Sequence, residues 1–172
     1  MTTIKIRPSS YTLSNTSNLS CDSNESSMYD SDDSTYATFS NSWASGDQFI
    51  YINGFNLSDI PEGAIVNSFT VKIKIRTSRV TSNNIYLTNG TNPTNDYSST
   101  RTTKNSSSAE TITIDKISSS WATLASYGSN LGIRINAERS TWLSAGYVYI
   151  YDAYIEANYT IPSYLAIKQN NT

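Results

Sequence analysis

An alternation of apolar and polar residues between positions 69 and 76 constrains the fold more than any other feature of the sequence. The apolar members are Phe69, Val71, Ile73 and Ile75, and the polar members are Thr70, Lys72, Lys74 and Arg76. A period of two predicts a β-strand with one face on a core and the other in water, because a helix would scatter these residues around its circumference. A second layer of structure must therefore cover the apolar face.

The rest of the chain predicts more strands, joined by polar loops. A turn at Ile60-Pro61-Glu62-Gly63 leads into the strand that contains the alternation at 69–76. Proline presets φ in such a turn, and glycine accepts a positive φ. Other strands are predicted at 3–6, 11–13, 48–55, 84–88, 111–114, 131–135 and 146–161, with a short helix at 118–128 and long loops at 14–34 and 89–109. This order predicts an all-β, antiparallel two-sheet sandwich of jelly-roll type with one short helix.

A single domain is expected over residues 1–172, with an N-terminal arm at 1–14 and a short C-terminal tail at 162–172. The closing strand is apolar on both faces between Tyr147 and Tyr151 and alternates after that. Burial on both sides, or a β-bulge near Asp152, would explain the change. On this reading Asp152 and Glu156 face solvent, and Arg134 in the preceding strand is exposed.

Composition excludes several functions. Ser, Thr and Asn make up 69 of the 172 residues, only 15% are charged, and the net charge of −2 comes without a concentrated basic cluster. Nucleic-acid binding is therefore not expected. No apolar run is long enough for a membrane span, and no signal-peptide core is present. Cys21 is the only cysteine, which predicts a free thiol, with an intermolecular bridge as the alternative.

The sequence predicts a protein that is not an enzyme. It has no histidine, the commonest general base, and no Gly-x-Ser-x-Gly elbow. Asp152 and Glu156 would lie about 13 Å apart along one extended strand, which is too far for a glycosidase pair. No cofactor is expected. Asp30, Asp32 and Asp33 could contribute to a structural calcium site, with a solvated acidic loop as the alternative.

Aromatic residues provide the remaining candidate sites. Trp43 and Trp142 lie in predicted loops and are candidates for glycan binding, because sugars stack on aromatic faces. Trp121 lies in the helical segment and is assigned to the core. Tyr147, Tyr149 and Tyr151 form a row that is a candidate oligomer interface, since tyrosine adds contact area at low entropic cost. Packing in the core or beneath a loop is the alternative for each.

Several segments also carry a resemblance to known proteins. They are Pro8–Asn15, Asp32–Ala37, Phe55–Ala64, Tyr127–Asn136 and Tyr149–Thr160. Together they resemble a family of small structural proteins of tailed phages that infect low-GC Gram-positive bacteria. The IP-x-GA turn, the long strand, the Trp-containing segment and the closing strand are also similar to galactose-binding-like jelly rolls of carbohydrate-binding proteins. The first resemblance implies a virion component, and the second implies a fold that often binds glycans.

These observations lead to two functional expectations. The first is a non-enzymatic virion structural protein of a bacteriophage, a capsid decoration, head fibre or tail-associated subunit assembled in the host cytoplasm. It would form a homo-oligomer, with a trimer favoured, and dock on other virion proteins. The alternative is a carbohydrate-binding module of the particle that recognises host cell-surface glycan through Trp43 and Trp142.

Overall fold

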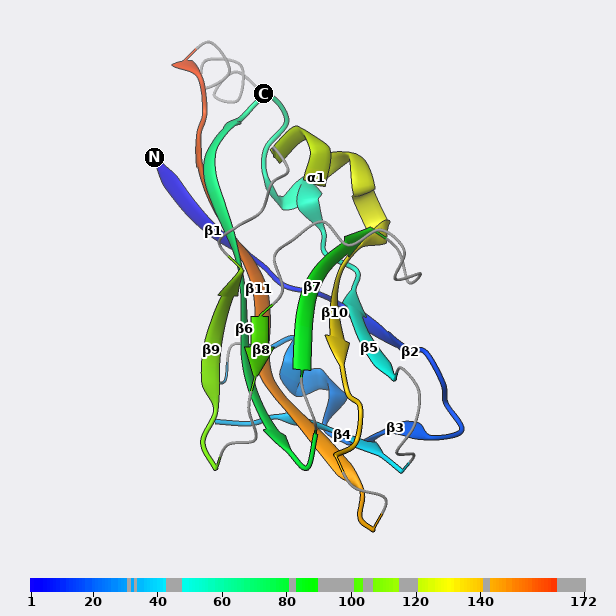
Figure 1. Ribbon diagram of the computed structural model, residues 1–172. Helices are drawn as coiled ribbons and strands as arrows, with labels where there is room; N and C mark the ends of the chain where they lie inside the picture. The colour runs from blue at the N-terminus through cyan, green and yellow to red at the C-terminus, as the bar shows by residue number, and fades with distance from the viewer. Residues whose placement is uncertain are drawn as a thin grey trace.

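The computed structural model describes residues 1–30, 32, 34–42, 48–80, 83–89, 101–103, 107–114, 121–140 and 143–163. They form two antiparallel sheets that lie face to face (Figure 1). Sheet A has the order β3 (Leu19–Ser23), β4 (Ala37–Asn41), β11 (Gly146–Thr160), β6 (Ile65–Ser78) and β9 (Glu110–Ile114), and β1 (Thr2–Ile6) also pairs with β11. Sheet B has the order β2 (Ser10–Leu13), β5 (Phe49–Asn53), β10 (Leu131–Asn136), β7 (Asn83–Asn89) and β8 (Arg101–Thr103).

The strand order is that of a jelly roll. Strands β4 and β11 pair, as do β5 and β10, β6 and β9, and β7 and β8. This nested set arises when one long antiparallel ribbon is wound around a core, so that successive pairs alternate between the two sheets. The predicted all-β sandwich of jelly-roll type is confirmed. The predicted short helix is α1 (Trp121–Tyr127), which η3 (Gly128–Asn130) extends.

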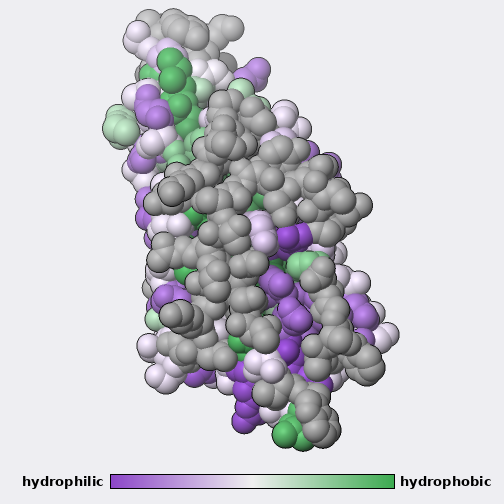
Figure 2. Space-filling view, in the orientation of Figure 1, coloured by the Kyte–Doolittle hydropathy of each residue, from purple (hydrophilic) through white to green (hydrophobic). Residues whose placement is uncertain are grey.

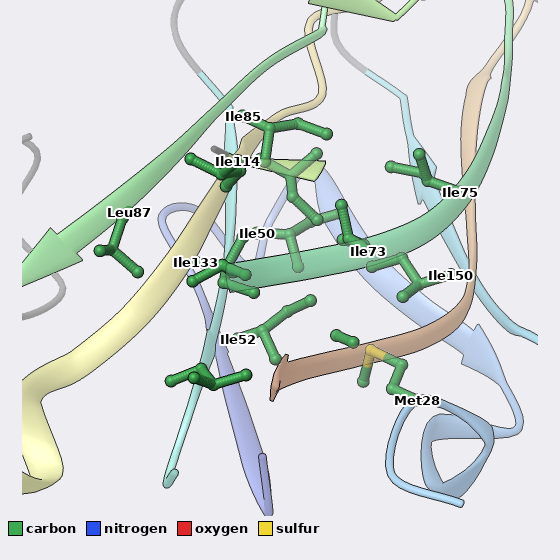
Figure 3. Packing of buried hydrophobic residues seen from close by; sticks show 14 of the residues in the cluster. Met28, Ile50, Ile52, Ile73, Ile75, Ile85, Leu87, Ile114, Ile133 and Ile150 are labelled. Atoms are coloured by element: carbon green, nitrogen blue, oxygen red, sulfur yellow. The ribbon is translucent and has the colours of Figure 1, made fainter. Parts of the chain in front are cut away.

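Isoleucine dominates the core between the sheets. Ile73 and Ile75 of β6 and Ile150 of β11 face Ile50 and Ile133 of sheet B, and all five side chains are fully buried (Figure 3). The inward positions predicted from the alternation at 69–76 are therefore correct. Burying one such side chain contributes about 1.5–3 kcal/mol to the free energy of folding, so this interior is the main source of stability.

The predicted irregularity in the closing strand is a β-bulge. Ile150 pairs with Ile75 of β6, but the next pair is Asp152 with Lys74, so Tyr151 is an extra residue in β11. The bulge changes which positions point inward, from even numbers before it to odd numbers after it. It therefore explains the change of pattern after Tyr151, while Tyr147–Tyr151 looks apolar on both faces because half-buried tyrosines occupy its outward positions.

Two polar segments contain structure that the sequence pattern did not predict. The expected loop at 14–34 includes β3 and the 3₁₀ turn η1 (Glu25–Met28), and β4 follows it. Leu19 of β3 and Met28 of η1 are fully buried, so two apolar side chains anchor this polar segment. The short strand β8 lies within the expected loop at 89–109.

The predicted turn before β6 is correct but shifted by one residue. The Ala64 N–H donates to the Pro61 carbonyl over 3.0 Å, so proline takes the first position of the turn. Gly63 has φ +77° at the third position, where a positive φ favours glycine. A further 3₁₀ turn, η2 (Leu57–Asp59), precedes it.

The expectation that Arg134 is exposed is wrong. Its side chain is on the outer face of sheet B and is only 7% exposed. The guanidinium lies 4.5 Å from the ring centroid of Phe49 and 4.2 Å from that of Tyr86. Two aromatic rings on neighbouring strands thus hold this cation by cation–π contact, which the alternation within one strand does not reveal.

Buried phenol groups predict a loss of stability at high pH. Burial raises the pKa of Tyr29 from 10.0 to about 12, and burial also raises the pKa of Tyr11. Because the folded state favours the neutral phenols, their contribution is complete below pH 10 and is lost as the pH rises toward 12. We expect the midpoint of thermal unfolding, followed by circular dichroism, to fall across this range. The fall should be smaller in Tyr29→Phe, and an equal fall would contradict the assignment.

Candidate functional site

The outer face of sheet A carries a row of tyrosines bordered by cations. We call this surface the tyrosine face, and it consists of Tyr36, Tyr147, Tyr149, Tyr151, Tyr154, Lys5, Arg7, Lys72, Lys74 and Arg76. Most of these residues come from the central strands β6 and β11. Their positions are fixed by the alternation of each strand, since the neighbouring side chains are buried in the core. The five tyrosines are all half-buried.

The tyrosine rings contact one another along the row. Tyr147 and Tyr149 are stacked, with ring centroids 6.1 Å apart and planes at 19°. Tyr36 meets the ring of Tyr149 edge-on at 5.4 Å and that of Tyr151 at 4.9 Å. Tyr36 precedes β4, so a residue distant in sequence completes the row. Such pairs contribute about 0.5–1.5 kcal/mol beyond their burial and make the row rigid.

Cations lie over the ring faces. The Arg76 guanidinium is 4.1 Å from the ring centroid of Tyr149, and Lys74 Nζ is 5.6 Å from that of Tyr151. Lys5 Nζ lies 4.5 Å from the ring centroid of Tyr154. Each of these cations covers one face of the ring that it contacts, so the edges and the phenol hydroxyls make up more of the surface that these rings present. Within the described part of the chain, none of the five hydroxyls of the row makes a hydrogen bond.

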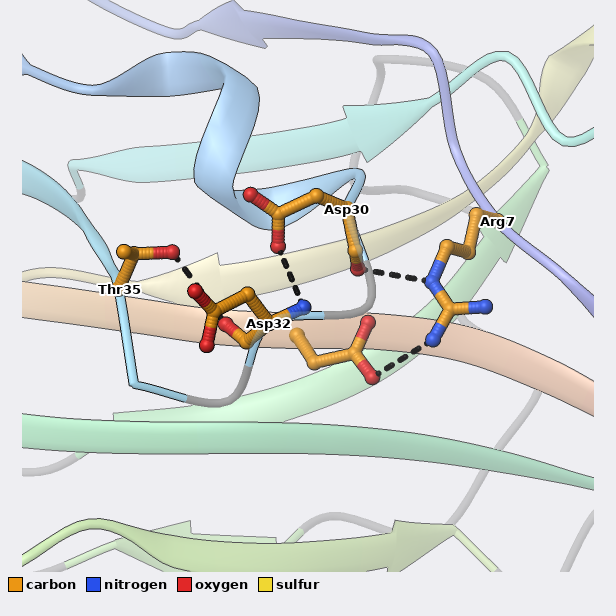
Figure 4. A network of polar contacts seen from close by, with 5 residues as sticks. Arg7, Asp30, Asp32 and Thr35 are labelled. Carbon is orange, nitrogen blue, oxygen red and sulfur yellow. Dashed lines mark hydrogen bonds and ion pairs between the residues drawn. The ribbon is translucent and has the colours of Figure 1, made fainter.

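An ion pair joins the N-terminal arm to the bulge. Arg7 Nη2 lies 3.1 Å from Asp152 Oδ2, and Arg7 Nε donates to the Asp30 carbonyl over 2.9 Å (Figure 4). The Asp152 side chain is only 5% exposed, so the expectation that it faces solvent is wrong. The reason is topological. Strand β4 pairs with β11 as far as Ile150 and β1 pairs from Ile155 onward, which leaves a notch at the bulge that Arg7 occupies.

Glu156 has a different environment from Asp152. Its carboxylate lies 3.0 Å from Lys72 Nζ, and both side chains are 26% exposed. Lys5 is its cross-strand neighbour in β1. Arg7 thus pairs with the Asp152 carboxylate and Lys72 with that of Glu156, and of these two carboxylates only that of Glu156 reaches solvent.

Hydrogen bonds between residues close in sequence organise the acidic segment after η1. Asp30 Oδ1 accepts from the Asp32 N–H over 2.9 Å, and the Asp32 carbonyl accepts from the Thr35 hydroxyl over 3.3 Å (Figure 4). Hydrogen bonds from the Ser34 hydroxyl and N–H lower the pKa of Asp32. Asp33 lies outside the described residues, among which no three His, Cys, Asp or Glu side chains are grouped to hold a metal. Calcium binding here stays a prediction.

The predicted tryptophan sites lie largely outside the described part of the chain. Trp43 and Trp142 are not among the described residues, so glycan binding by them stays a prediction. Trp121 packs against Phe69, with ring centroids 5.4 Å apart, and is partly buried against the core. The assignment of Trp121 to the core is confirmed.

The predicted tyrosine row is part of a larger surface than the sequence indicated. Tyr147, Tyr149 and Tyr151 are indeed on one exposed face, but Tyr36, Tyr154 and the cations from β1 join them. The alternation of Lys72, Lys74 and Arg76 was the available signal, because these residues occupy the outer face of the strand paired with β11. Their use as an oligomer interface stays a prediction.

The remaining surface has few apolar features. Figure 2 shows mainly hydrophilic atoms in the described part of the face in view, with hydrophobic areas near its two ends. Large exposed apolar side chains within the described ranges are Met1, Ile65 and Leu143. No helix in these ranges is both long and apolar enough to cross a membrane. Cys21 is a free, half-buried thiol whose pKa is raised by burial.

Comparisons with known proteins find similar structures but no related sequence. No family model matches the chain, and no curated protein matches it. A CBM4 structure is 13% identical, with a TM-score of 0.48 over 72% of this chain and 84% of its own. Chitosan-binding module 1 of a chitosanase/glucanase from Paenibacillus sp. IK-5 is 13% identical, with a TM-score of 0.45 over 87% and 96%.

A third similar structure is the family 32 CBM of C. perfringens NanJ in complex with galactose. It is 14% identical, with a TM-score of 0.46 over 90% of this chain and 99% of its own. These three structures are carbohydrate-binding modules. With TM-scores below 0.5, they assign neither a ligand nor a site to this chain.

The environment of Arg7 predicts that losing the Arg7–Asp152 ion pair lowers the free energy of unfolding more than losing the Lys72–Glu156 pair. Arg7→Ala leaves the buried Asp152 carboxylate without this partner, and we expect it to lower the free energy of unfolding by about 2–3 kcal/mol. Lys72→Ala breaks the more exposed pair with Glu156 and should cost less than about 1 kcal/mol. Urea titrations of both variants measure these values. Equal losses would contradict a structural role for the Arg7–Asp152 pair.

Proposed function

We propose that this protein is a non-catalytic glycan-binding module that holds an extended polysaccharide across the tyrosine face. The carrying observation is the row of five half-buried tyrosines whose hydroxyls make no hydrogen bond within the described part of the chain. Phenol hydroxyls both donate and accept, and a polysaccharide offers matching hydroxyl groups along its length. The row stands on paired central strands, so the donors are held in place before a ligand binds.

The chemistry of the surface supports binding without catalysis. Asp152 is buried in an ion pair with Arg7, and Glu156 is held by Lys72. Neither carboxylate faces the other across a cleft, which both glycosidase mechanisms require. The ligands named for the similar modules, chitosan and galactose, are not transferred to this chain. The proposal depends on the tyrosine face alone.

Paired substitutions test the role of the hydroxyls. Tyr149→Phe/Tyr151→Phe retains both rings and removes two hydroxyls, each worth about 1 kcal/mol in a hydrogen bond. We expect binding to a panel of immobilised polysaccharides, measured by affinity electrophoresis, to weaken roughly tenfold or more. Tyr86→Phe on the outer face of sheet B is the matched control and should bind as the unchanged protein does. Unchanged binding by the double variant would reject this face.

The tryptophan prediction provides a competing site that the same panel can separate. If Trp43 and Trp142 hold the sugar, Trp43→Ala/Trp142→Ala abolishes binding and the Tyr→Phe pair does not. If the tyrosine face holds it, the outcome is reversed. Circular dichroism of each variant shows whether its fold is intact, so loss of binding is not mistaken for unfolding.

A second candidate is a virion structural subunit that assembles through the same face. Tyrosine and arginine are enriched in protein interfaces, and the tyrosine face contains five tyrosines with Arg7 and Arg76. On this candidate the protein is a phage component assembled in the host cytoplasm, with a trimer as the expected state. Size-exclusion chromatography with light scattering distinguishes the candidates, because an interface predicts an oligomer that dissociates when Tyr149 and Tyr151 are changed to alanine.

A further inference from the structure

The tyrosine face is asymmetric in charge across its width. On one side of β11 lie three acidic residues. Asp22 accepts from the hydroxyls of Ser20 and Ser40 over 2.7 and 2.9 Å, and Asp30 and Asp32 follow η1 beside Arg7. On the other side lies β6, whose outward residues include Lys72, Lys74 and Arg76. The side of the tyrosine row toward β1 and β4 thus carries these acidic residues together with Lys5 and Arg7, whereas β6 carries basic residues and no acidic one.

The basic strand presents its cations in a line. Outward residues of one strand are two positions apart, so Lys72, Lys74 and Arg76 are spaced by about 7 Å. Beyond them, β9 places Thr111 beside Lys74 and Thr113 beside Lys72. The result is a track with basic residues along its floor, threonines on one side and tyrosines on the other. A repeated spacing suits a polymer better than a single small anion.

Part of this positive charge is available to a ligand. Lys72 is paired with Glu156, but no carboxylate in the described ranges pairs with Arg76, whose Nη1 reaches only the Ser107 carbonyl at 3.5 Å. The Nε atom of Arg76 is buried, so the terminal nitrogens of its guanidinium are the donors that a ligand can reach. Hydrogen bonds from charged donors to anionic oxygens are about twice as strong as neutral ones, so an anionic group gains most from this position.

We propose that the ligand is an acidic polysaccharide whose carboxylate groups lie along β6, between the tyrosine row and the threonines of β9. This inference rests on the glycan-binding function proposed above and adds the charge and the position of the ligand. Arg76 covers one face of the Tyr149 ring, and Lys74 and Lys5 lie over the rings of Tyr151 and Tyr154, so less ring area is open for a neutral sugar to stack on. The tyrosine edges carry positive partial charge, and together with Lys74 and Arg76 they complement anionic oxygens. Across β11, Asp22, Asp30 and Asp32 offset the charge of Lys5 and Arg7, so β6 is the more positive side, on which the chain lies.

Nucleic acid does not fit this surface. Single strands bind by stacking bases on exposed aromatic faces, and here cations lie over the rings of Tyr149, Tyr151 and Tyr154. Duplex binding depends on many phosphate contacts, whereas this chain has a net charge of −2 and one short basic line. A second copy of the chain would instead give concentration-dependent mass in light scattering.

Two forms of one polysaccharide test the inference. Polygalacturonate carries a carboxylate on each residue, and fully methyl-esterified polygalacturonan has the same backbone without the charge. We expect the whole protein to bind the acidic form at least tenfold more tightly by isothermal titration calorimetry. The preference should weaken as salt rises toward about 0.15 M, because added ions screen exposed charges.

A charge variant locates the track. Lys74→Gln/Arg76→Gln changes the net charge from −2 to −4 and should lower affinity for polygalacturonate about tenfold or more. Thr12→Asp/Ala125→Asp makes the same change of net charge at exposed positions on sheet B and α1, and should retain the affinity. Equal losses of affinity in both variants would show that net charge causes the effect, and would reject binding of the ligand along β6.

The outcomes separate the two proposals. Equal binding of both polymers, lost in Tyr149→Phe/Tyr151→Phe, would overturn the acidic ligand and leave the glycan-binding face standing. Phosphomannan binding that depends on Lys74 and Arg76, without polygalacturonate binding, would overturn the carboxylate ligand and show that phosphate is the anion. Failure to bind any of the three polymers, or self-association through this face, would overturn the acidic ligand.

Discussion

The pairing of β6 with β11 is the interaction on which the rest of the structure depends. These two long strands are paired from Ile65 and Thr160 at one end to Ser78 and Tyr147 at the other. Their inward side chains supply the centre of the core, and their outward side chains supply most of the tyrosine face. Every other strand of sheet A pairs with one of them or is joined to one through a neighbour. A change in their register would therefore alter the core and the surface together.

The β-bulge shows how one local irregularity adjusts both faces. The extra residue Tyr151 keeps the apolar residues of both halves of β11 pointing inward while the strand passes two different partners. It also opens the notch that Arg7 and η1 fill, which brings Asp152 into a buried ion pair. The N-terminal arm is thus part of the tyrosine face, since Lys5 of β1 and Arg7, which follows β1, lie over the ring of Tyr154.

Sequence periodicity predicted the parts of the fold that are set within one strand. The inward residues of β6 and the jelly-roll order followed from alternation and spacing, and a bulge near Asp152 was one of two explanations that the pattern of β11 left open. Periodicity failed to predict burial at positions that are covered by residues from another strand or segment. Arg134 is buried because Phe49 and Tyr86 lie on either side of it, and Asp152 is buried because Arg7 reaches it from the other end of the chain. The polar composition of 14–34 concealed β3 and η1, which are anchored by Leu19 and Met28.

The candidate site was predictable only in part for the same reason. Tyr147, Tyr149 and Tyr151 were visible as a row within one strand, but Tyr36 and Lys5 join it through tertiary contacts. Those contacts change the chemistry of the row. Isolated tyrosines suggest aromatic faces for sugar stacking, whereas rings with a cation over one face offer more of their edges and hydroxyls. The assembled surface therefore favours a ligand rich in acceptor oxygens, and β6, which carries three basic residues and no acidic one, makes its side of the row the more positive.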